Sequence, residues 1–283
     1  MRRKKVCFVG YGSTEYSRKS EASALSYYAD AIRDALRQTG LDKKEIRGFS
    51  ITTQASPDYS PHVAEQLGLE VDWVLNGDYG GAGGVMSTRR AADAIECGHL
   101  DLAVLVGGNS FDRSTPTQRQ LEYQRGNFVD VFGFGGPNSL MALIQRLHMA
   151  NYGTTLEQIG KIAIAQRFNA INNPQALFRE PMSMQDYLNS RMISDPIRLF
   201  DCVMPCSGAE CILLASEEKA KQITDKLVYL VTDAEISHYQ VANMLPDKTT
   251  FGQKIVGERI FSELKREDID LFEIYDDYPI GVM

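Results

Sequence analysis

Residues 76–84 read Asn-Gly-Asp-Tyr-Gly-Gly-Ala-Gly-Gly and are the part of the chain best suited to bind a reactive group. After them, apolar residues recur among charged ones at the spacing of an α-helix, up to Gly98. Glycine commonly ends a helix by adopting the left-handed backbone conformation. We therefore expect the glycines at a helix N-terminus, where unpaired N–H groups and the positive dipole end can hold an oxyanion, a thioester carbonyl or a phosphate. The alternative is a tight strand-to-helix turn whose glycines only allow close packing.

The composition limits what the protein can be. With 283 residues, 43% of them hydrophobic and 24% charged, the chain is expected to form one large domain or two medium ones. A net charge of -7 argues against a nucleic-acid partner. The basic start at 2–5 precedes an apolar run of only four residues, which favours a first strand over a secretory signal. No apolar run reaches membrane-spanning length, so we expect a cytoplasmic protein without membrane contact.

Cysteines and histidines offer no metal or redox motif. The cysteines are odd in number and widely spaced, which predicts reduced thiols. No histidine repeats at a metal-ligand spacing, so structural or surface roles are expected and no metal site follows. Gly10-Tyr11-Gly12 lacks the third glycine of a dinucleotide fingerprint, which argues against a nicotinamide cofactor. These residues are Cys7, Cys97, Cys202, Cys206 and Cys211, and His62, His99, His148 and His238.

Strand and helix patterns alternate over the first hundred residues. Strands are predicted at 6–9, 49–52 and 102–106, and a first helix begins near Ser20 or Ser23 and ends at Gly40. Asp42 and Glu45 form a capping-box pattern before the second strand. This βαβαβ order predicts an α/β layered fold with a largely parallel sheet, in which ligands lie beyond the carboxyl ends of the strands. The apolar face of the first helix is formed by Leu25, Tyr28, Ala31, Ile32, Ala35 and Leu36.

The pattern changes between about 109 and 195, where aromatic and polar residues surround an apolar helix near 140–147. We interpret this stretch as an insert that covers a site. An apolar strand at 209–216 resumes the fold, and a strand near 227–231 begins a second half. The expected organisation is thus an N-terminal half at 1–222, containing the insert, and the start of a C-terminal half at 223–283.

The order of these elements, together with four short segments, resembles the thiolase superfamily. Within it, the chain is similar to sterol-carrier-protein-type thiolases, acetyl-CoA acetyltransferases and thiolase-like aldolases that shorten steroid side chains. The match covers essentially the whole chain, and it implies a layered fold of duplicated βαβαβ halves, the second of them incomplete here. The segments are Asp78-Tyr79-Gly80-Gly81, Asn172-Asn173-Pro174, residues 194–202 (Ser-Asp-Pro-Ile-Arg-Leu-Phe-Asp-Cys) and Tyr275-Asp276-Asp277-Tyr278.

Two departures from the family limit which activity can be carried over. Counting back from Gly98, the acyl-accepting cysteine of true thiolases corresponds to Gly81, which has no side chain to form an acyl-enzyme. Cys97 lies at the other end of the same helix, where the dipole disfavours a thiolate. In the resembling families, the segment that matches 275–278 is followed by a Gly-His motif and a late catalytic cysteine. Here the sequence stops at Met283, so we expect either that those residues are absent or that another subunit supplies them. The predicted strand at 271–275 would then need a cover.

The thiolase-like aldolases lack the same cysteine and cleave a β-hydroxyacyl-CoA by a retro-aldol reaction. This chemistry needs a base for the hydroxyl proton and donors for the enolate. The resemblance makes Tyr275 the candidate base or proton donor, with Asp276 raising its pKa, and the direction of proton transfer stays open. Tyr79 is a second candidate, unless it packs beneath the turn. The expected substrate-binding residues are Gly80, Gly81 and Gly83, whose amides face the thioester, and Tyr278, an aromatic of the family motif for which packing is the alternative.

Two alternatives to the aldolase remain. One is an acyltransferase with an unusual nucleophile, for instance Cys206, and the other is a non-catalytic scaffold that binds acyl-CoA or lipid. Coenzyme A is expected as part of the substrate and no further cofactor is expected. By resemblance, the chain forms a homodimer or a heteromer, the latter with an acyl-CoA-binding partner that carries an OB-type domain.

Overall fold

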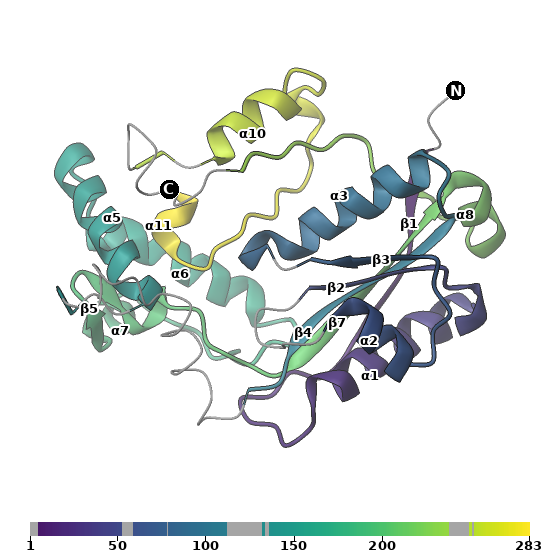
Figure 1. Ribbon diagram of the computed structural model, residues 1–283. Coiled ribbons are helices and arrows are strands. Elements are labelled where there is room, and N and C mark those ends of the chain that lie inside the picture. Colours follow the sequence, from purple (N-terminus) through teal and green to yellow (C-terminus); the bar gives the residue numbers. More distant parts are fainter. Residues whose placement is uncertain are drawn as a thin grey trace. The chain divides into compact units, whose positions relative to one another are not determined.

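The computed structural model describes residues 5–52, 59–77, 79–111, 132–133, 136–237, 249–250 and 252–283 (Figure 1). The chain divides into two compact units. The first comprises Met1–Arg113 and Cys206–Asp233, and the second comprises Ser114–Pro205 and Ala234–Met283. The organisation into halves at 1–222 and 223–283 stays a prediction.

A six-stranded sheet forms the centre of the first unit. The predicted alternation of strands and helices is present from β1 to β4, and the strand that resumes after the insert is β7. The strand order is β3-β2-β4-β7-β1-β8. The strands are β1 (Val6–Ser13), β2 (Gly48–Thr52), β3 (Trp73–Asn76), β4 (Leu102–Asn109), β7 (Gly208–Ser216) and β8 (Val228–Tyr229).

The prediction of a largely parallel sheet is wrong. β2 runs parallel to β3 and β4, but β7 is antiparallel to both β4 and β1, and β8 is antiparallel to β1. Parallel neighbours arise from helical crossovers such as those that connect β2, β3 and β4. β7 instead follows the long insert, whose length leaves the direction of the returning strand free.

Helices α1 (Ala24–Thr39) and α2 (Ser60–Gln66) cover one face of the sheet (Figure 1). Ser23 caps α1 by accepting from the Ser26 N–H, and Gly40 ends it with a φ of 70°, as the sequence predicted. Asp42 and Glu45 form the predicted capping box on a short 3₁₀ turn at Lys43–Glu45. Together with α8 (Glu217–Ile223), these helices contribute to a core that contains Tyr28, Ala31, Ile32, Ala35, Phe49, Ile51, Val104, Val106, Leu213 and Ala220.

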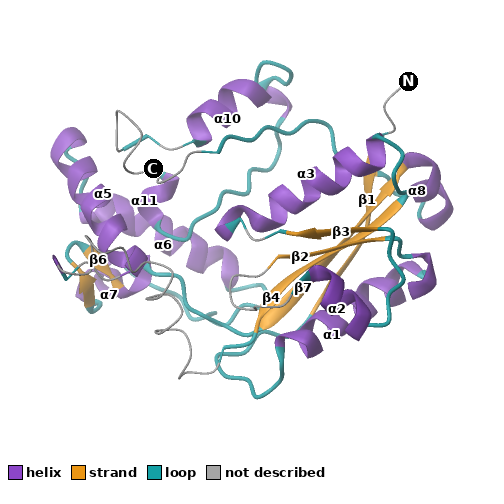
Figure 2. Cartoon of the chain, viewed as in Figure 1, coloured by secondary structure: helices purple, strands orange, loops and turns teal. Residues whose placement is uncertain are grey.

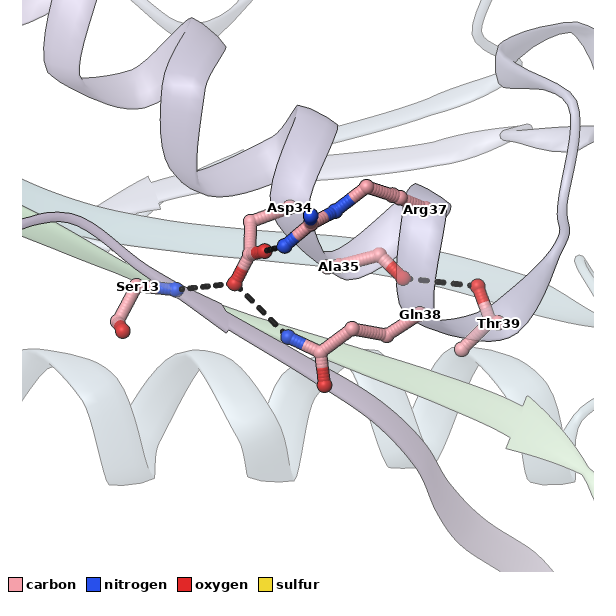
Figure 3. Close-up of polar contacts among 6 residues, drawn as sticks. All are labelled: Ser13, Asp34, Ala35, Arg37, Gln38 and Thr39. Carbon is pink, nitrogen blue, oxygen red and sulfur yellow. Dashed lines mark hydrogen bonds and ion pairs between the residues drawn. The ribbon is translucent and has the colours of Figure 1, made fainter.

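The carboxyl end of β1 is joined to α1 by a polar contact. Asp34 Oδ2 accepts from the Ser13 N–H at 3.3 Å and from Gln38 Nε2 at 2.8 Å, while Asp34 Oδ1 accepts from Arg37 Nη2 at 2.5 Å (Figure 3). The hydrogen bond from Arg37 is the largest of the effects that lower the pKa of Asp34. A Cβ at Gly12, one residue earlier, would lie 2.2 Å from the Ala31 carbonyl oxygen, so glycine there allows α1 to approach the strand closely.

The opposite face of the sheet carries α3 (Gly83–Glu96), the helix predicted after the glycine run (Figure 1). Gly98 has a φ of 78°, which confirms the predicted cap. Ser50 Oγ on β2 lies 3.3 Å from Ser87 Oγ on α3, and both residues are fully buried. The apolar contacts of this face form a second core from Val6, Ala91, Ala92, Ala94, Ile95, Leu100, Ala103, Leu105 and Leu214.

The second unit is mainly helical and has its own core. Its elements are α5 (Gly136–Tyr152), α6 (Leu156–Ala170), α7 (Met184–Asn189), β5 (Met192–Ser194), β6 (Ile197–Arg198), α10 (Gln253–Ile260) and α11 (Pro279–Val282), with 3₁₀ turns at Leu199–Asp201 and Arg266–Asp268. The core contains Ala142, Ile144, Ile159, Ala163, Met182, Tyr187, Ile197, Tyr278 and Ile280.

The strand predicted at 271–275 is not formed. Residues 269–278 are a loop (Figure 2), and the side chains of Leu271 and Phe272 are 76% and 74% exposed. An apolar run becomes a strand only when a neighbouring strand takes up its backbone hydrogen bonds, and no described strand pairs with this segment.

Candidate functional site

The glycine run connects β3 to α3, as predicted. Asn76 ends β3, Gly80–Ala82 form a 3₁₀ turn, and α3 begins at Gly83. Gly80 has a φ of 63°, a conformation that other residues rarely adopt. The Gly83 N–H donates to the Gly80 carbonyl, whereas within the described chain no acceptor contacts the amides of Gly80 and Gly81. The two unused amides are at the helix start, where they suit a developing negative charge.

Packing explains part of the glycine content. A Cβ at Gly77 would lie 1.9 Å from Ser87 Oγ, and one at Gly83 would lie 2.7 Å from the Gly77 carbonyl oxygen. A Cβ at Gly84 would meet no heavy atom within 4 Å. The packing alternative therefore holds for Gly77 and Gly83, while Gly84 has no such explanation. Gly81 is exposed to solvent.

Tyr79 lies at the start of this turn. Its N–H donates to the Gly77 carbonyl at 3.0 Å, and its side chain is 43% exposed. The ring is thus not buried beneath the turn. Its role in chemistry stays a prediction, and Asp78 lies outside the described residues.

Tyr275 lies in the second unit on the loop that precedes α11, and it is 59% exposed. Partial burial and then the carboxylates of Asp277 and Asp276 raise the pKa of this phenol. A phenol with a raised pKa stays protonated at neutral pH, because its ordinary pKa is already about 10. Of the two directions that the sequence left open, proton donation is the one that this environment favours.

Asp277 is a neighbour that sequence reasoning missed. Its Oδ1 accepts from the Tyr278 N–H at 2.9 Å, and burial raises the pKa of its carboxyl group more than this hydrogen bond lowers it. It also has a larger effect on Tyr275 than Asp276, the carboxylate chosen from the sequence. The acidic pair after Tyr275 was the available signal, but the sequence does not say which of two adjacent carboxylates is partly buried.

Tyr278 is buried, with 3% of its surface exposed. Its hydroxyl donates to Asn138 Oδ1 at the start of α5, and Cys202 Sγ lies 3.6 Å from the same oxygen. This arrangement fixes the loop at its junction with α11. Whether Tyr278 also contacts a substrate stays a prediction.

The cysteines provide no activated thiol at the glycine turn. Cys97 caps the C-terminal end of α3, far from the glycines along the helix. Burial raises the pKa of Cys206, and it raises the pKa of Cys202 to about 11. Cys7 and Cys211 are buried in the sheet, and all five cysteines are free. A raised pKa lowers the thiolate fraction, so Cys206 is a poor nucleophile in this environment.

The candidate residues are divided between the two units: the glycine turn and Tyr79 are in the first, and Tyr275, Asp276 and Tyr278 are in the second. Among the residues described, no group of three or more His, Cys, Asp or Glu side chains could hold a metal ion, and His238 lies outside them. No helix in the described ranges combines the length and the apolar character that crossing a membrane requires.

Comparisons with known proteins identify the fold class of the chain. No protein-family model matches the chain. A solved SCP2-thiolase-like protein type 1 from Mycobacterium smegmatis has a similar fold, with a TM-score of 0.73 at 18% identity over 98% of this chain and 61% of that one. The chain therefore has a thiolase-like α/β fold.

Within that class, the similarity extends to aldolases. The chain is 27% identical to a steroid side-chain-cleaving aldolase of Thermomonospora curvata, over 96% of this chain and 74% of the relative. The solved Ltp2-ChsH2(DUF35) aldolase superposes with a TM-score of 0.88 at 25% identity. The match covers 100% of this chain and 76% of the aldolase chain. The resemblance to the thiolase superfamily, and to its steroid side-chain aldolases, is confirmed.

Proposed function

We propose that this chain is a thiolase-fold aldolase subunit that cleaves the carbon–carbon bond of a β-hydroxyacyl-CoA with a steroid or similarly bulky side chain. The observation that carries this proposal is the glycine turn at the start of α3. No acceptor in the described part of the chain contacts the amides of Gly80 and Gly81, and residues 76–84 contain no sulfur. Main-chain donors can stabilise an enolate on a thioester, but they cannot form an acyl-enzyme. The aldolase relatives support the same reaction.

In the proposed reaction, the amides of the turn bind the thioester oxygen. A base removes the proton of the β-hydroxyl group, the carbon–carbon bond breaks, and a ketone leaves. The electron pair of that bond forms the enolate, which takes up a proton at carbon to give the shorter acyl-CoA. We assign the proton donor to Tyr275, because its raised pKa keeps the phenol protonated.

We further propose that the chain works in a heteromer with an acyl-CoA-binding protein that carries an OB-type domain. The two-part name of the solved aldolase supports this arrangement. A homodimer is the alternative, and a cytoplasmic location is part of the same proposal.

The test is to incubate the purified chain, alone and with candidate partners, with a β-hydroxyacyl-CoA. Release of a ketone and a shorter acyl-CoA is the expected result. A mass increase on Cys206 after treatment with acyl-CoA indicates the acyltransferase alternative, and tight binding without either product indicates a scaffold.

A further inference from the structure

A second polar cluster, outside the residues of the proposed reaction, lies where β1 ends and β7 begins. Tyr16 donates its hydroxyl hydrogen to Glu210 Oε1. The other carboxylate oxygen, Oε2, is buried and has no hydrogen-bond partner among the described residues. A buried acceptor without a donor is unfavourable, because it has given up its hydrogen bonds to water. This oxygen would therefore gain from an incoming hydrogen-bond donor.

The backbone holds this cluster in place. Ser17 and Ser207 exchange two backbone hydrogen bonds, of 3.0 and 2.7 Å. The Tyr16 ring packs on Gly208, where a Cβ would lie 2.6 Å from the ring and where φ is 152°. Ser13, at the end of β1, donates its N–H to Asp34 (Figure 3). Tyr16 and Glu210 are therefore fixed before any ligand arrives.

Tyr11 is the exposed member of the cluster, with 49% of its surface open to solvent. A hydrogen bond with Ser13 lowers the pKa of Tyr11, whereas burial, the negative charge of Glu210 and a hydrogen-bonding interaction with the Glu210 side chain raise it. The Tyr11 hydroxyl therefore stays protonated and lies beside the Glu210 carboxylate, although it makes no hydrogen bond to Oε2.

The register of the sheet gives the position of the cluster relative to the glycine turn. Thr52 pairs with Gly107, Gly107 pairs with Glu210, and Glu210 pairs with Ser13. Directly paired residues point to the same face of a sheet, and the neighbouring row that contains Ser50 faces α3 through Ser87. Thr52 also lies under the turn, 3.2 Å from a Cβ placed on Gly83. Glu210 is thus on the α3 face, two strand spacings or about 10 Å from the residue beneath the turn.

This spacing, together with the contact to Tyr16, favours one of two roles for Glu210. In a β-hydroxyacyl thioester, the hydroxyl oxygen is three bonds from the carbonyl carbon, or at most about 4 Å at about 1.5 Å per bond. The Glu210 backbone lies two strands from the residue beneath the turn, and Tyr16 holds its carboxylate. We therefore assign Glu210 to a polar group further out on a bulky acyl chain rather than to the reacting hydroxyl group.

We propose that Tyr11, Tyr16 and Glu210 form a specificity subsite for a hydroxyl group carried about 10 Å from the thioester on the bulky part of the acyl chain. The hydroxyl group donates to Glu210 Oε2 and accepts from the Tyr11 hydroxyl, while Tyr16 holds the carboxylate through Oε1. The inference rests on the proposed function for the position of the thioester. A site built to pair with a hydroxyl group discriminates strongly against analogues that cannot donate to it.

The test uses two non-cleavable acyl-CoAs that lack the β-hydroxyl group and differ only in a hydroxyl or an oxo group at that distance. Calorimetric titration of the full chain is expected to give a preference of about tenfold or more for the hydroxyl compound. Glu210→Gln is expected to reverse the order. Tyr16 still donates to the amide oxygen, so the amide NH₂ group takes the place of Oε2 and donates to the oxo group.

Glu217→Gln is the matched control, because Glu217 also accepts from a tyrosine hydroxyl, that of Tyr229 at 2.8 Å, in the same unit. It should leave the preference unchanged. Tyr16→Phe should weaken the preference without reversing it. Equal binding of the two compounds by the wild type, together with intact cleavage of β-hydroxyacyl-CoA, overturns the subsite alone. Absence of binding by any acyl-CoA overturns both the subsite and the proposed function.

Discussion

The two units hold their candidate phenols in different ways. In the first unit, Tyr16 is packed on Gly208, and its hydroxyl donates to Glu210 on a neighbouring strand. In the second, Tyr275 lies on a loop and is 59% exposed, although Tyr278, three residues later, is buried and bonded to Asn138. The first arrangement suits recognition by a fixed surface. The second suits a phenol that contacts the substrate from a loop, where only the end of the loop at Tyr278 is held in place.

The same contrast applies to the glycines. Gly77 and Gly83 are required by the close packing of the turn, whereas Gly84 faces open space. Within one run of sequence, some positions are therefore constrained by packing and others have open space beside them. Substitutions that separate these two groups test the comparison directly.

The largest effect is expected from Tyr275→Phe. Removing the proton donor should lower kcat by about 10²–10⁴-fold with little change in unfolding free energy, since the side chain is mostly exposed. Steady-state kinetics with a β-hydroxyacyl-CoA and urea unfolding measure the two quantities. A variant with normal kcat would remove Tyr275 from the reaction.

Gly77→Ala should destabilise the first unit by about 1–3 kcal/mol, because the added Cβ overlaps Ser87 Oγ. Gly84→Ala is the matched control. It places a methyl group in open space and should raise the stability of α3 by up to about 1 kcal/mol. Equal urea midpoints for the two variants would contradict the division of the glycines into packed and open positions.

Tyr278→Phe should cost about 1–3 kcal/mol of stability, because it removes the donor to Asn138 Oδ1. The expected change in kcat is smaller than that of Tyr275→Phe. A thermal-unfolding scan of both variants places the structural role on Tyr278 and the chemical role on Tyr275. A reversed pattern would exchange the two assignments.

A smaller effect is expected from Asp277→Asn on the pH dependence. Activity that requires protonated Tyr275 persists through neutral pH and falls as the pH rises through the raised pKa of this phenol, above its ordinary value of about 10. Removing the negative charge of Asp277 lowers that pKa, so the alkaline limb of kcat should move to lower pH. Burial makes the larger contribution to the raised pKa, so the move should be partial. A shift to higher pH would show that Asp277 acts in another way.

The smallest effect is expected from Cys206→Ala, which should leave kcat unchanged. Burial raises the pKa of this thiol, and the proposed reaction forms no acyl-enzyme. Loss of activity together with an acyl adduct on the wild-type Cys206 would instead support the acyltransferase.

The sequence by itself determined the features that depend on neighbouring residues. These include the alternation of strands and helices, the caps at Gly40 and Gly98, the capping box at Asp42 and the position of the glycine run before α3. Each of these features depends on residue periodicity or backbone conformation within a few neighbouring residues, so the sequence signals for them are local. The order of these elements and the four short segments were also enough to indicate the thiolase superfamily.

Only the tertiary structure decided the features that depend on distant residues. It showed that β7 runs antiparallel, that the apolar run at 271–275 forms no strand, and that Asp277 affects Tyr275 more than Asp276 does. It also paired Tyr16 with Glu210, which is 194 residues away along the chain. Burial and strand pairing arise when separated segments pack against one another. The spacing of residues within a single segment does not predict those contacts.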